Sequence, residues 1–125
     1  MSKIDDLKEL MNLLKDDATS VAENAGLCNQ LGEYVIIRTY SAGVWFGKLE
    51  QKSGKEVILS EARRMWKWLA AKSISLSGVA MYGIREDESK ICPALDKVWL
   101  EAIEILSLSD VAIKSLKEAK DVEAE

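Results

Sequence analysis

Residues 34–51 read YVIIRTYSAGVWFGKLEQ, and this stretch decides the fold that we expect for the chain. Its first part, 34–40, is rich in β-branched and aromatic side chains, which favour a β-strand. Ser41-Ala42-Gly43 has the small residues of a turn, and residues 44–51 resume as a second strand. The stretch therefore predicts a β-hairpin.

The sequence after this hairpin predicts an antiparallel meander. Ser53-Gly54 is a turn signal, and residues 56–59 favour a third strand. Residues 62–68, ARRMWKW, continue in extended form, with alternate side chains on opposite faces. A further strand is expected over 98–106, VWLEAIEIL.

Three segments favour helices instead. Capping serines and a terminal glycine predict a short helix from Ser73 to Gly83, and Ser109 or Asp110 caps a last helix through about residue 119. Residues 2–14 place apolar side chains on one stripe, which is typical of an amphipathic helix. That helix needs an apolar partner on the domain body or on a second chain.

These elements predict a single α+β domain over residues 1–125. Its fold would be a small antiparallel β-sheet with an N-terminal amphipathic helix, a short middle helix and a C-terminal helix. We expect residues 1–32 to be a helical segment used in oligomerisation, residues 33–119 to be the ligand-binding body, and residues 120–125 to be a frayed tail.

The composition limits the functions that this chain can have. A net charge of −4 opposes nonspecific binding to duplex nucleic acid. Histidine is absent and the two cysteines, Cys28 and Cys92, lie far apart, so we expect no metal site, no cofactor and no histidine-based catalysis. The chain has no apolar run of about 20 residues and no signal-peptide core, which predicts a soluble intracellular protein without membrane contact.

The densest unusual feature is residues 63–68, where three cations and two indoles share six positions. Arginine forks suit phosphate oxygens and indoles suit a flat base, so Arg63, Arg64, Trp66 and Trp68 are candidates for binding a nucleotide. The alternative is that the tryptophans belong to the core and the cations are a solvated strand face.

A second candidate lies at the predicted hairpin turn. Arg38 and Tyr40 share one strand face and lead into Ser41, Ala42 and Gly43, whose amides would approach a phosphate that Arg38 neutralises. A plain hairpin with an exposed arginine explains the same residues. The scattered acidic residues form no carboxylate pair, and we therefore predict that the protein is not an enzyme.

Five short motifs, in this order, resemble a family of phage proteins, the Thoeris anti-defence sponges of the first described type. They are YVI(V/I)RT, SAGV, ARR-x-W-x-W, SLS-x-LA-x-x-G and EAIEI, and here they occur at 34–39, 41–44, 62–68, 75–83 and 101–105. The likeness covers about two-thirds of the chain. Trp45-Phe46 is bulkier than the small residues common after SAGV. If the second strand lines the ligand pocket, this difference predicts a ligand preference that differs from that of the relatives.

The resemblance implies a protein that binds cyclic ADP-ribose isomers of the glycocyclic type, made by bacterial TIR enzymes, without cleaving them. Some relatives also hold cyclic oligonucleotides of CBASS defence at separate sites. It further implies a homodimer or higher homo-oligomer in the cytoplasm of the infected bacterium. Arg38, Arg63 or Arg64 would neutralise phosphates, and Trp66, Trp68 or Tyr82 would stack on adenine. The alternatives are a protein-binding inhibitor or structural factor acting through its helices, and an enzyme that degrades the signal.

Overall fold

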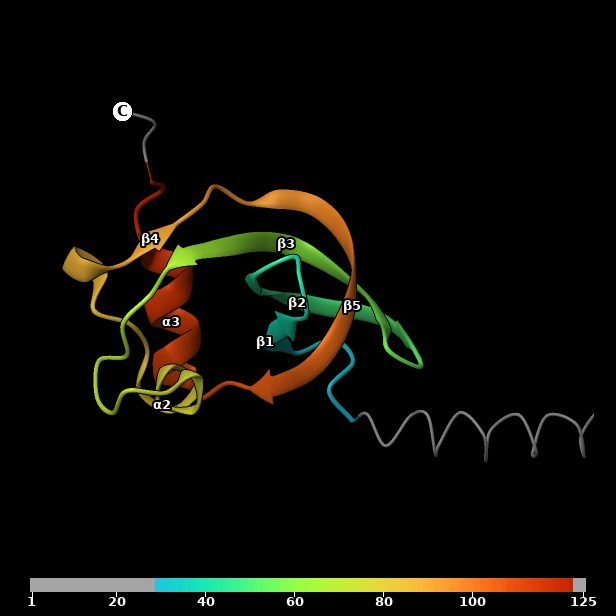
Figure 1. Cartoon of the computed structure of the whole chain (residues 1–125), viewed down its shortest axis with the longest axis horizontal. Coiled ribbons are helices and arrows are strands. Elements are labelled where there is room, and N and C mark those ends of the chain that lie inside the picture. The colour runs from blue at the N-terminus through green and yellow to red at the C-terminus, as the bar shows by residue number, and fades with distance from the viewer. Residues whose placement is uncertain (1–28, 123–125) are drawn as a thin grey trace, which may run out of the picture.

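The computed structural model describes residues 29–122, whose main feature is a closed barrel of antiparallel strands (Figure 1). The barrel strands are β1 (Tyr34–Thr39), β2 (Val44–Ser53), β3 (Glu56–Lys67) and β5 (Leu95–Ser107). β2 lies between β1 and β3, and β5 closes the ring by pairing with both β1 and β3. The short β4 (Lys90–Ile91) pairs with the end of β3.

Closure of the barrel depends on two long, bent strands. The first part of β5 pairs with β3, and its last part, from Ala102 to Ser107, pairs with β1. β3 stays continuous through Glu61, whose φ of 49° is unusual for a residue other than glycine. On either side of Glu61, Ser60 pairs with Lys97 of β5 and Ala62 pairs with Leu95. The backbone irregularity at Glu61 thus joins two extended segments into one strand.

The barrel interior is filled by alternate residues from all four barrel strands. Val35 and Ile37 from β1 are fully buried there, and the neighbouring strands add further apolar side chains at the same period of two. The other buried members of this interior cluster are Trp45, Leu49, Val57, Leu59, Ala62, Leu100 and Ala102.

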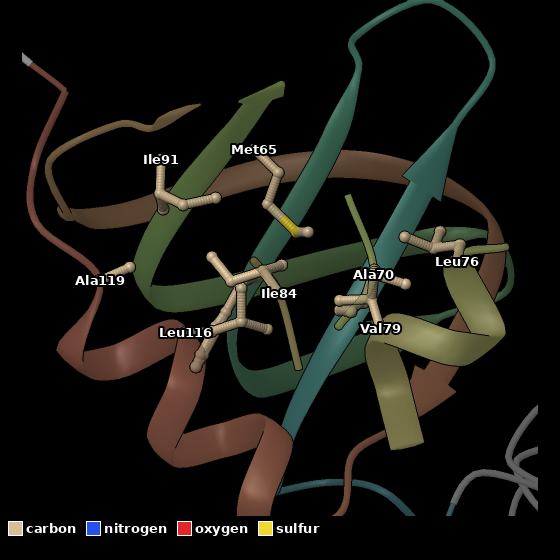
Figure 2. Packing of buried hydrophobic residues seen from close by; sticks show 10 residues of the cluster. Met65, Ala70, Leu76, Val79, Ile84, Ile91, Leu116 and Ala119 are labelled. Atoms are coloured by element: carbon tan, nitrogen blue, oxygen red, sulfur yellow. The ribbon is translucent and has the colours of Figure 1, made fainter. Parts of the chain in front are cut away.

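A second apolar cluster lies outside the barrel, where two short helices cover one side of it (Figure 1). These helices are α2 (Leu76–Tyr82) and α3 (Asp110–Glu118). Ile36 and Phe46 face this side, so β1 and β2 are buried on both faces. Figure 2 shows Met65 of β3 and Ile91 of β4 in the same cluster as Leu116 of α3.

Serine caps hold the two helices in place and connect them. The Ser75 hydroxyl accepts from the amide of Gly78 at the start of α2, and the Ser109 hydroxyl accepts from the amide of Ala112 at the start of α3. The same Ser109 hydroxyl donates to the carbonyl of Met81, 2.7 Å away. The end of α2 is therefore tied directly to the beginning of α3.

Arg63 anchors the other end of α3 to the barrel. Its guanidinium is buried and donates to the carbonyls of Cys92 and Leu116 at 2.9 and 2.7 Å. A longer bond of 3.5 Å reaches the carbonyl of Lys117, and a bond of 2.8 Å reaches the carboxylate of Asp121. One side chain of β3 thus joins the segment after β4, the end of α3 and the chain beyond it.

A second contact holds α3 against the start of β1. The Lys117 ammonium lies 4.1 Å from the centroid of the Tyr34 ring, and the Tyr34 hydroxyl donates to Glu61 at 2.9 Å. The Tyr34 side chain, and to a smaller extent the charge of Glu61, raise the pKa of Lys117 above its usual value. The irregular residue of β3 therefore takes part in fixing α3.

The predicted α+β class is wrong for the described residues, which are mainly antiparallel β-structure. Strand structure makes up 49% of them, and their two α-helices are short. The segments expected separately at 56–59 and 62–68 form one strand, and β5 is longer at both ends than the 98–106 prediction. The predicted N-terminal helix lies outside the described residues.

The predicted frayed tail is partly described. Arg63 binds Asp121, and the amide of Val122 donates to the carbonyl of Ile91 at 2.8 Å. Residues 123–125 lie outside the described part of the chain. Within residues 29–122, no helix has the length and apolar character needed to cross a bilayer.

The buried network predicts that Arg63→Ala lowers the free energy of unfolding by about 3 kcal/mol, because several buried carbonyls lose their donor. Asp121→Asn is the matched control, and it should cost less than Arg63→Ala because the asparagine oxygen still accepts a hydrogen bond from the buried guanidinium. Urea denaturation followed by tryptophan fluorescence measures both. Equal costs for the two variants would contradict the anchoring role of Arg63.

Candidate functional site

Arg64 lies on β3 next to Arg63 but points to the opposite face, as the alternation of a strand requires. It is opposite Trp45 in the register of β2 and β3. The carbon at the centre of its guanidinium lies 4.6 Å from the centroid of the Trp45 ring. Trp45 is itself only 3% exposed, so Arg64 is spread over a fixed aromatic surface at the end of the barrel.

Arg64 differs from the other arginines in its charge partners. Among the described residues, Arg38 pairs with Glu104 at 2.9 Å, Arg63 with Asp121 at 2.8 Å and Arg85 with Glu88 at 3.7 Å. Arg64 has no such carboxylate partner within residues 29–122. Stacking on an indole uses the flat face of a guanidinium and leaves the N–H groups at its edge available. An anion is the partner that those donors suit best.

An apolar hollow lies beside this arginine. Its volume is about 360 Å³, and we call it the Arg64 hollow; it is lined by Trp45, Arg64, Cys92, Pro93, Ala94 and Leu95. The amide of Cys92 donates to the carbonyl of Arg64 at 2.8 Å, while its own carbonyl accepts from Arg63. Hydrogen bonds between Cys92 and the two adjacent arginines, Arg63 and Arg64, therefore hold the wall formed by residues 92–95 in place.

Trp45 also connects Arg64 with the turn between β1 and β2. Its indole N–H donates to the carbonyl of Ala42 at 2.9 Å. The turn is further closed by Thr39, whose hydroxyl accepts from the amide of Ala42 and donates to the carbonyl of Gly43. Gly43 has a φ of 86°, a conformation that few other residues adopt. The structure thus brings two of the predicted site regions together through Trp45.

A second hollow, of about 450 Å³, lies on the other side of this turn. We call it the turn hollow; it is lined by Thr39, Tyr40, Ser41, Ala42, Lys55 and residues 99–103 of β5. Its lining contains one cation, Lys55, and one carboxylate, Glu101, and the neighbouring Arg38 is paired with Glu104. The amide of Ala42 already has an acceptor within the turn. The turn hollow therefore suits a phosphate less well than Arg64 does.

The remaining predicted residues are not gathered in either hollow. Arg63 is buried, and each of its three guanidinium nitrogens donates to an acceptor in the network around α3. Trp66 is 69% exposed, two residues beyond Arg64 on the same face of β3. Trp68 packs against the cluster under the helices, and Tyr82 is on α2, with the ammonium of Lys72 5.4 Å from its ring centroid.

The residues that surround Arg64 are not evident from the sequence pattern. Trp45 appeared only as a bulky departure from a motif, and residues 92–95 were assigned no role. Both depend on strand register, which places Trp45 opposite Arg64 and Cys92 beside it. The cations and indoles clustered at residues 63–68 were the available signal, but the pattern does not say which of two adjacent arginines is buried.

The described residues thus form a small closed β-barrel, covered on one side by two helices, with a stacked and unpaired arginine at its surface. Residues 32–116 match the family described as "Domain of unknown function (DUF6948)", and the chain belongs to this family. No curated protein and no solved structure gives a significant match to the chain.

The exposed position of Arg64 predicts that Arg64→Ala lowers the free energy of unfolding by only about 0.5 to 1 kcal/mol, the usual worth of an exposed cation–π contact. The adjacent Arg63→Ala serves as the comparison under the same urea titration. A loss for Arg64→Ala as large as that for Arg63→Ala would show that Arg64 is a structural residue.

Proposed function

We propose that this protein binds an anionic nucleotide at Arg64 and sequesters it without breaking a bond. The observation that carries the proposal is the Arg64 guanidinium, which is stacked on Trp45 and has no carboxylate partner among the described residues. Its edge donors would bind phosphate oxygens. The apolar Arg64 hollow beside it supplies contacts for the uncharged part of such a ligand.

The ligand that we propose is a cyclic ADP-ribose isomer of the glycocyclic type, produced by a bacterial TIR enzyme of Thoeris defence. The support is the resemblance of residues 34–116 to phage anti-defence sponges, together with the chemistry of the ligand. Its pyrophosphate matches a free arginine, and its adenine matches an apolar hollow. The proposed place of action is the cytoplasm of an infected bacterium.

Sequestration works by mass action and needs no catalytic group. The chain contains no histidine, the side chain that most often acts as a general acid or base in enzymes. Nanomolar affinity corresponds to about −12 kcal/mol, and protein in excess of the dissociation constant depletes the free signal. Charge-assisted hydrogen bonds of about 1.5 to 3 kcal/mol each and a buried base would supply a large part of that.

We propose that the active form is a homodimer or a multiple of it. Large aromatic side chains support this, because Trp66 is 69% exposed and Trp99 of β5 is 56% exposed. Exposed aromatic residues of this size are common where a second chain packs. A partner protomer would also help to enclose a ligand held at the barrel surface.

We expect the purified protein to deplete a cyclic ADP-ribose isomer from solution and to release it intact after denaturation, as measured by chromatography of the supernatant. Arg64→Ala should weaken this binding by about ten-fold or more, since one phosphate contact is worth at least about 1.4 kcal/mol. Arg85→Ala is the matched control, because that arginine is exposed but paired with Glu88.

The other outcomes separate the competing functions. A cleaved product would mean that the protein is an enzyme that degrades the signal. Absence of binding to every isomer tested would refute sequestration, and stoichiometric recovery of a host protein in a pull-down would then favour an inhibitor that acts by protein contact. Equal binding by the Arg64→Ala and Arg85→Ala variants would remove Arg64 from the site.

A further inference from the structure

We infer that the Arg64 hollow is the binding site for the flat base of the ligand, with the segment Cys92 to Leu95 as one wall and the phosphate at the outer edge of Arg64. The inference rests on the proposed function, because it names the part of the nucleotide that each residue receives. The segment that joins β4 to β5 would then contact the ligand.

The lining of the hollow favours a ring over a sugar or a phosphate. Carbon side chains of Pro93, Ala94 and Leu95 form the wall, and no carboxylate is among the lining residues. A volume of about 360 Å³ falls in the usual range for small-molecule sites, about 300 to 1,000 Å³. Sugar hydroxyls placed against such a wall would lose hydrogen bonds to water without replacement, whereas a base presents an apolar face.

The wall is also fixed before any ligand arrives. Both backbone polar groups of Cys92 are hydrogen-bonded, one to the carbonyl of Arg64 and the other to the side chain of Arg63. At the other end of the wall, Leu95 pairs with Ala62 as the first residue of β5. A wall that is held in this way loses little conformational freedom on binding, which favours affinity.

Trp66 offers a competing place for the base, since its indole is also near Arg64 in sequence and is 69% exposed. It does not line the Arg64 hollow. Stacking on Trp66 would give the base contacts with one side chain, whereas six residues line the hollow. Because the gain from apolar burial grows with the area removed from water, the hollow is the better position.

Cys92 provides a direct readout, because it is half-buried and lines the hollow. In a Cys28→Ser variant it is the single cysteine of the chain, and its alkylation by N-ethylmaleimide is followed by mass spectrometry. Saturating cyclic ADP-ribose isomer should slow this alkylation by about ten-fold or more, since thiol reactivity depends on access. A bound ligand that leaves the alkylation rate unchanged would overturn the inference while the proposed function stands.

Ala94→Trp tests the same site independently, because a large ring at this exposed position would fill the hollow. We expect it to weaken binding of the isomer by about ten-fold or more, at least about 1.4 kcal/mol, with an unchanged melting temperature. Val111→Trp is the comparison, because it places a large ring at an exposed position of α3 outside the hollow, and it should retain affinity. Unchanged binding by Ala94→Trp would place the base outside the hollow and leave Trp66 as the alternative position. If the unmodified protein binds no isomer, the proposed function itself fails, and this inference fails with it.

Discussion

The buried guanidinium of Arg63 is the interaction on which the arrangement of the molecule depends. It lies where β3, the segment after β4 and the end of α3 meet, and its donors reach three backbone carbonyls and the carboxylate of Asp121. A buried charge is tolerated only when its hydrogen bonds are made. The helices on one side of the barrel and the wall of the Arg64 hollow are therefore positioned by the same side chain.

That anchoring explains why two adjacent arginines have different roles. Strand alternation sends Arg63 toward the helices and Arg64 to the other face, over Trp45. Arg63 is satisfied by protein atoms, whereas Arg64 keeps its edge donors available. Because Cys92 is bonded to both residues, the structural arginine fixes the hollow in which the available arginine would hold its ligand.

Much of the local structure could be predicted from the sequence. The strand expected at 34–40 forms over Tyr34–Thr39 with the turn after it, and Gly83 and Ser109 cap helices as predicted. The middle helix begins after Ser75, however, and not at Ser73. Closure of the barrel could not be predicted, because it requires β5 to bend and pair with two strands that are distant in sequence. The positive φ of Glu61, which keeps β3 continuous, has no sequence signal either.

The candidate site was predictable in kind but not in membership. The cations and indoles of residues 63–68 indicated an anionic aromatic ligand, yet only strand register reveals that Trp45 lies beneath Arg64. The phosphate role expected for Arg38 meets a competing contact, since its guanidinium bonds Glu104. Pairing between β1 and β5, which creates that contact, is again a long-range property.

The central claim is that Arg64 holds the ligand, and a proton–nitrogen NMR spectrum of the arginine side chains tests it most directly. The chain has four arginines, so four Nε–H signals are expected. Our account predicts that a saturating cyclic ADP-ribose isomer shifts the Arg64 signal and leaves those of Arg63 and Arg85 in place. Binding that shifts the Arg38 signal and leaves the Arg64 signal unmoved would contradict it.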